Sequence, residues 1–131
     1  MLDHHNGSLT LARAGHDAPL LYRRAQQSVE PVKPSGMVLG IDSGSVFDRV
    51  TGDFVIPLER DDCLVLYTDG VTEALDANGC EFGFERMTQC VRASAGNGAP
   101  AILTRLIDDL RNFVGAHPQN DDITLIAIRK T

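Results

Sequence analysis

The segment that most constrains the fold is a short apolar run that ends on a carboxylate. Residues 63–67 read CLVLY without a polar interruption, and Thr68, Asp69 and Gly70 follow at once. A run of this length between polar segments is typical of a β-strand that is covered on both faces. Such a strand needs neighbouring strands and a packed layer on each face. The chain is therefore expected to build a sheet interior, with Asp69 at the exit of one strand.

Several other segments predict strands around this one. Residues 7–16 alternate and residues 18–24 are largely apolar, which predicts two strands joined as a hairpin through a turn near Gly15. A short strand is expected at residues 46–50 and another at 54–58, followed by a polar turn at 59–62. Residues 123–128 are apolar on both faces, which is typical of a strand in the middle of a sheet.

Two helices are predicted between these strands and the last one. Residues 84–95 place apolar side chains on one helical face, and residues 100–114 follow the i, i+3, i+4, i+7 pattern closely. Pro100 suits a first helical turn and Gly115 suits a helix end. Strands, then two helices, then a strand indicate an α+β fold with mainly antiparallel pairing. The 131 residues fit a single domain spanning 1–131.

Composition excludes several classes of function. The chain carries 12 basic and 18 acidic residues, a formal charge of −6, so a nucleic-acid partner is not expected. No apolar run approaches the roughly 20 residues of a membrane helix, and the N-terminus lacks a hydrophobic leader. We therefore expect a cytoplasmic protein without a membrane partner. Three cysteines without C-x-x-C spacing argue against a disulfide framework or a zinc site.

Acidic residues stand at the ends of two predicted strands. Asp69 follows residues 63–67, whereas Asp121 and Asp122 precede residues 123–128. If these strands are antiparallel neighbours, the carboxylates meet at one end of the sheet, where a Mg²⁺ or Mn²⁺ ion would relieve their repulsion. Gly70, which lacks a Cβ, would let backbone and water approach such an ion. From the residues alone, ordinary turn acids are the favoured interpretation and a metal site is the alternative.

Several motifs, in a fixed order, point to a known family. The segments AGHDAPLLYRR, LGI, LERDDCLVLYTDGVTEALDANGCEFGFERM and NDDITLIAIR follow one another along nearly the whole chain. Together they resemble the metal-dependent protein serine/threonine phosphatases (the PPM, or 2C-type, family), in the bacterial sporulation-protein-E-like branch. The resemblance implies a β-sandwich flanked by helices, with two Mn²⁺ or Mg²⁺ ions that activate water for hydrolysis of phosphoserine or phosphothreonine.

The resemblance also assigns roles to individual residues. Asp69 and Asp121 would be direct metal ligands, and Asp122 would support the loop or a metal-bound water. Glu73 is a candidate for the second coordination shell and could equally be a solvated acid. His16 is a second candidate there: it could bind the metal, donate a proton or only brace its turn, and bracing is the favoured role. No residue of this chain is assigned to catalysis. The implied substrate is a phosphorylated regulator of the anti-anti-sigma type in a partner-switching pathway.

The family's first metal motif, a G-D-x-x-G-H-G-like stretch, is absent from these residues. The sequence therefore resembles the C-terminal part of the phosphatase domain, with the N-terminal part missing. We expect little or no activity from this chain alone, and self-association through open sheet edges. Two alternatives are a non-catalytic module that binds a phosphoprotein in the same kind of pathway and a plain structural fragment.

Overall fold

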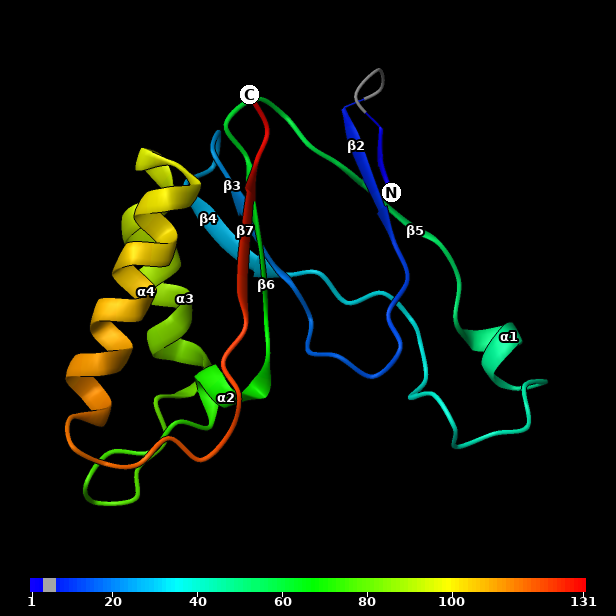
Figure 1. Ribbon diagram of the computed structural model, residues 1–131. Coiled ribbons are helices and arrows are strands. Elements are labelled where there is room, and N and C mark those ends of the chain that lie inside the picture. Colours follow the sequence, from blue (N-terminus) through cyan, green and yellow to red (C-terminus); the bar gives the residue numbers. More distant parts are fainter. Residues whose placement is uncertain (4–6) are drawn as a thin grey trace.

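A computed structural model describes residues 1–3 and 7–131 of the chain. In this part of the chain the strands form two sheets, and two long helices cover the outer face of the larger one (Figure 1). Every pair of neighbouring strands is antiparallel. The three-stranded sheet has the order β1 (Leu2–Asp3), β2 (Ser8–Leu11), β5 (Phe54–Pro57), and the four-stranded sheet has the order β4 (Ser28–Pro31), β3 (Leu20–Arg23), β6 (Cys63–Tyr67), β7 (Leu125–Arg129). The α+β sandwich expected from the sequence is thus confirmed.

The helices differ greatly in length. Two of them are single turns, α1 (Phe47–Val50) and α2 (Asp69–Thr72). The long helices α3 (Gly83–Ser94) and α4 (Ala99–Val114) are joined by the 3₁₀ turn η1 (Ala95–Asn97). Pro100 lies in the first turn of α4 and Gly115 caps its end, as the sequence predicts. Among the described residues, none of these helices is both long and apolar enough to cross a lipid bilayer.

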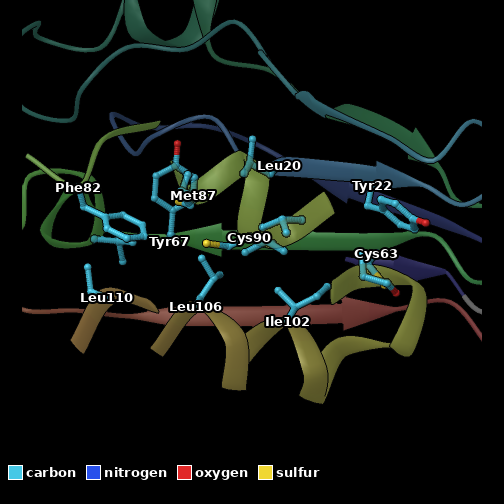
Figure 2. Packing of buried hydrophobic residues seen from close by; sticks show 14 residues of the cluster. Leu20, Tyr22, Cys63, Tyr67, Phe82, Met87, Cys90, Ile102, Leu106 and Leu110 are labelled. Carbon is cyan, nitrogen blue, oxygen red and sulfur yellow. The ribbon is translucent and has the colours of Figure 1, made fainter. Parts of the chain in front are cut away.

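Strand β6 divides the core into two clusters, because its side chains alternate between the faces of the sheet. Cys63, Val65 and Tyr67 belong to the larger cluster, which lies between the four-stranded sheet and helices α3 and α4 (Figure 2). Leu64 belongs to the smaller cluster, which fills the space between the two sheets together with Ile56 of β5. The apolar run at residues 63–67 is therefore covered on both faces, as predicted.

Two local predictions are wrong. Residues 7–16 and 18–24 do contain strands, but β2 pairs with β1 and β5 whereas β3 pairs with β4 and β6, so the chain crosses between sheets instead of forming a hairpin. The crossing lets the leucines of β2 pack between the sheets. Residues 46–50 contain helix α1 in place of a strand. Asp42 Oδ2 accepts hydrogen bonds from the backbone N–H groups of Gly44 and Val46, at 2.9 and 2.7 Å, and so holds the turn that leads into the helix.

The last strand also differs from its prediction. Among the described strands, β7 has only one neighbour, β6, and so forms an edge of the four-stranded sheet. One face of β7 packs on the helices through Leu125 and Ala127. The other face leaves Ile126 half exposed. Residues 123–128 are apolar on both faces, yet among the described residues the helix-facing side of β7 is only partly buried and the opposite side is less covered still.

Candidate metal centre

The adjacent ends of β6 and β7 bring the two acidic segments together. The strands are antiparallel neighbours, with Tyr67 opposite Leu125 in the register, as the sequence analysis required. Beyond this pair, Thr68 Oγ1 donates a hydrogen bond to the Asp122 carbonyl oxygen and accepts one from the Thr124 backbone N–H, each at 2.9 Å. The hydroxyl of Thr68 therefore fixes the segment that contains Asp121 and Asp122 against the exit of β6.

Gly70 allows the closest approach between the two segments. A Cβ atom built on Gly70 would lie 2.6 Å from the Asp122 carbonyl oxygen and 3.1 Å from the Asp122 carbonyl carbon. Real side chains do not tolerate the shorter of these contacts, so only glycine fits here. The sequence analysis gave Gly70 the role of admitting a metal ion. In the structure, its missing side chain makes room for the backbone of the opposite segment.

The two candidate ligands present their carboxylates in the same way. Asp69 Oδ1 accepts the Gly70 backbone N–H at 3.0 Å, and Asp121 Oδ1 accepts the Asp122 backbone N–H at 2.7 Å. Within the described part of the chain, the Oδ2 atom of each carboxylate has no hydrogen-bond donor. Both residues are exposed. Each aspartate thus has one carboxylate oxygen that is hydrogen-bonded to the backbone and a second that has no hydrogen-bond donor among the described residues.

Two carboxylates are, by number and type, an incomplete set of ligands for a hard cation. No group of three His, Cys, Asp or Glu side chains with metal-binding geometry occurs in residues 1–3 and 7–131. Mg²⁺ and similar ions commonly bind through one or two carboxylates, while water and substrate phosphate fill the remaining positions. Asp69 and Asp121 are two carboxylates of this kind, on segments that meet at one end of the sheet. A two-ion centre needs further ligands.

Two other predicted residues, Asp122 and Glu73, lie on the same two segments, and their side chains are exposed. Asp122 contributes its backbone carbonyl to Thr68, and its side chain is exposed. Glu73 caps the end of α2 through its backbone N–H, which donates to the Asp69 carbonyl oxygen at 2.8 Å. Glu73 is therefore one helical turn from Asp69, and its side chain is exposed.

His16 lies in the connection between β2 and β3, and its ring is exposed. This connection passes near the exit of β6. The pKa of Tyr67 is raised to about 12, mainly by burial and to a smaller extent by the charge of Asp17, while Arg13 acts in the opposite direction. The loop is held locally, because Arg13 Nε donates a hydrogen bond to the His16 carbonyl oxygen. The loop that carries His16 therefore has charged residues close enough to Tyr67 to affect its pKa.

Sequence reasoning missed the pocket beside this centre. A cavity of about 650 Å³ is lined by Gly70, Glu73 and Asp121 together with residues from α4 and the segment after it. Among these are Arg111 and His117, and the sequence analysis assigned no role to either. The only signal in the sequence was the proximity of His117 to Asp121 along the chain.

Comparisons with known proteins agree with this arrangement. A family model described as stage II sporulation protein E (SpoIIE) matches residues 1–131. The chain is 29% identical over 128 residues to protein IcfG from Synechocystis sp., covering 98% of the chain and 19% of IcfG. It is 28% identical over 123 residues to phosphoserine phosphatase RsbU from Bacillus subtilis, covering 92% of the chain and 34% of RsbU.

A solved structure shows the same fold. The SiaA-PP2C domain of Pseudomonas aeruginosa superposes with a TM-score of 0.81 at 23% identity, over 99% of this chain and 49% of that one. The chain therefore spans about half of that phosphatase structure and at most about a third of the two relatives.

Proposed function

This chain belongs to the SpoIIE family of PP2C-type (PPM) phosphatases, and we propose that it contributes the Asp69 and Asp121 side of a metal-dependent centre that hydrolyses phosphoserine or phosphothreonine. The observation that carries the proposal is the junction of Thr68 and Gly70 with Asp122, which holds the two acidic segments together at one end of the sheet. Because the chain spans about half of the solved phosphatase structure, the activity is proposed for the complete domain.

Each residue at the junction has a defined task in this proposal. Asp69 and Asp121 bind one Mn²⁺ or Mg²⁺ ion through their free carboxylate oxygens. The bound metal would supply the Lewis acid for attack of water on the phosphoryl group. Thr68 and Gly70 keep the spacing of the two aspartates constant, since a shift of the Asp122 backbone would break the Thr68 hydrogen bond. Glu73, one turn further, adds negative charge at the rim.

The proposed substrate is the phosphoserine or phosphothreonine of a regulatory protein. RsbU carries the name phosphoserine phosphatase, which supports phosphoserine as the substrate residue. The proposal extends this to an anti-anti-sigma-type regulator of a partner-switching pathway in the cytoplasm. Two carboxylates alone are also what a non-catalytic phosphoprotein-binding module would retain. Binding without hydrolysis by the complete domain would favour that alternative.

Calorimetric titration of this chain with Mn²⁺ tests the centre directly. We expect weak binding of one ion, and a loss of about tenfold or more in affinity for both Asp69→Asn and Asp121→Asn, because each removes one of two charged ligands. Asp108→Asn is the matched control, since Asp108 is an exposed acid on α4 that does not line the junction. Equal affinities for all four proteins would refute the assignment.

We also propose that this chain associates with itself through the edge of β7. Edge strands offer unpaired backbone groups, and here Ile126 adds half-exposed apolar surface. Sedimentation velocity should show an oligomer whose fraction rises with concentration. Ile126→Lys should shift it toward monomer, whereas a monomer at every concentration would contradict the proposal.

A further inference from the structure

The pocket beside the candidate centre has an apolar floor and a charged rim. It occupies about 650 Å³ between α2, the second half of α4 and the segment that leads to β7. A volume of this size is in the range that takes drug-sized ligands or short peptide segments. Its apolar lining consists of Ala74, Leu75, Ile107, Leu110, Val114 and Ile123.

The pocket opens directly onto the junction described above. Gly70, Glu73 and Asp121 belong both to the pocket lining and to the surroundings of the candidate centre. A molecule held in the pocket is therefore in contact with the segment that presents Asp121. The two sites are close enough to be occupied by neighbouring residues of one bound chain.

Charges on the rim favour a polypeptide over a small anion. Glu73 and Glu81 lie on the α2 side of the pocket, and Arg111 lies on the α4 side. Arg111 is exposed and forms no ion pair with any described residue. A free anion would be repelled by the carboxylates. A peptide segment carries both apolar and polar groups and can satisfy walls of opposite charge.

His117 adds a directional contact to the same rim. Its Nδ1 donates a hydrogen bond to the Pro118 carbonyl oxygen at 3.0 Å, since a carbonyl oxygen can only accept. The neutral ring then carries its free lone pair on Nε2. The half-buried ring can accept a hydrogen bond from a backbone N–H of a bound segment.

We propose that this pocket is the docking subsite for the residues that flank the phosphorylated residue of the substrate protein, and that a large apolar side chain of the substrate occupies its floor. The inference rests on the proposed phosphatase function and deepens it. The metal centre recognises the phosphoryl group, which all substrates share. The pocket selects among phosphoproteins through the neighbouring side chain.

An oriented peptide library tests the subsite. The 131-residue chain, immobilised and loaded with Mn²⁺, is exposed to seven-residue peptides with a central phosphoserine and randomised flanks, beside the same library with serine. We expect retained phosphopeptides to be enriched in Leu, Ile, Met or Phe within three residues of the phosphoserine. Ile107→Glu, which places a charge among the apolar side chains that line the pocket, should weaken binding of a selected peptide by about tenfold or more.

Two controls separate the pocket from general charge and folding effects. Thr104→Glu introduces the same charge on an exposed position of α4 outside the pocket, and it should bind the selected peptide like the wild type. Arg111→Glu reverses a rim charge without touching the core and should change the preferred polar neighbours. Its control is Arg92→Glu on α3, which is exposed and lies outside the pocket. Circular dichroism checks that every variant remains folded.

The outcomes distinguish this inference from the phosphatase proposal. Two results overturn the subsite without contradicting the metal centre. One is retention that depends on phosphate but shows no apolar preference, and the other is an apolar preference that Ile107→Glu leaves unchanged. Equal retention of serine and phosphoserine peptides overturns the assignment of the pocket to a phosphoprotein substrate. The Mn²⁺ titration then tests the metal centre independently. Retention of no peptide by the wild type also overturns the subsite.

Discussion

Replacement of Gly70 by alanine sets two physical effects against each other. Gly70 lies inside the helical turn α2, where alanine is intrinsically favoured over glycine by about 1 kcal/mol. On helix propensity alone, Gly70→Ala should stabilise the protein. The structure predicts the opposite, because the new Cβ would lie 2.6 Å from the Asp122 carbonyl oxygen.

The size of the effect follows from what has to move. The Cβ meets backbone atoms, not the end of a flexible side chain, so the segment around Asp122 must shift by several tenths of an ångström. Overpacking of this kind costs about 1–3 kcal/mol, and the shift also strains the bond from Thr68 Oγ1 to the Asp122 carbonyl. After subtraction of the gain in helix propensity, overpacking alone leaves a net loss of about 0–2 kcal/mol. The strained hydrogen bond adds to this, and we expect a total loss of about 1–2 kcal/mol. At this chain length that loss lowers the melting temperature by roughly 4–8 °C.

Urea unfolding followed by circular dichroism measures this difference. Gly52→Ala is the matched control, because a Cβ on Gly52 has no atom within 4 Å, and its unfolding free energy should change by less than about 0.5 kcal/mol. In the Mn²⁺ titration, Gly70→Ala should also weaken binding, since Asp121 moves with its neighbour. A Gly70→Ala protein as stable as the wild type would show that the close approach of the two segments is not a constraint.

Two further predictions concern the core. Asp62 is buried, and its carboxylate accepts hydrogen bonds from the Arg23 guanidinium and the Arg24 backbone N–H, each at 2.9 Å. Asp62→Ala should therefore lower the free energy of unfolding in urea by about 2–4 kcal/mol. A loss below about 1 kcal/mol would contradict this role. Burial, followed by the hydrogen bond to a neighbouring carboxylate, raises the pKa of Cys90 to about 12. The thiol therefore stays protonated at pH 8, and a thiol reagent should label the exposed Cys80 but not Cys90 until urea is added. Rapid labelling of Cys90 in the folded protein would refute the burial argument.

The sequence was sufficient for the features that depend on local periodicity. The apolar run at residues 63–67 predicted a strand covered on both faces, because burial on both sides removes the polar alternation. The pattern from Ile102 to Val114 predicted α4 together with its first turn and its end. The position of Asp69 and Asp121 at strand ends predicted that their segments meet, because antiparallel neighbours place one exit beside one entrance.

Features that depend on contacts between distant segments could not be predicted from the sequence. The chain between β2 and β3 looks like a hairpin turn, and only the packing of the β2 leucines against Leu21 and Leu64 between the sheets shows that it crosses layers. Helix α1 depends on the hydrogen bonds of a single side chain, Asp42. The pocket combines three segments, and the pattern of each one does not show that a cavity forms between them.

Strand β7 shows why apolar residues on both faces of a segment do not by themselves place it in the middle of a sheet. The hydrophobic pattern indicates which faces of a strand are buried, but it does not indicate which element covers them. Leu125 and Ala127 are covered by helices of this chain. Ile126 is half exposed, and Ile128 borders an apolar cavity of about 480 Å³ with Leu9, Leu11 and Leu66. An apolar surface of this kind beside an unpaired edge is the combination from which association is expected. The same residues that misled the prediction of a central strand therefore support the proposal that β7 has a partner outside the described chain.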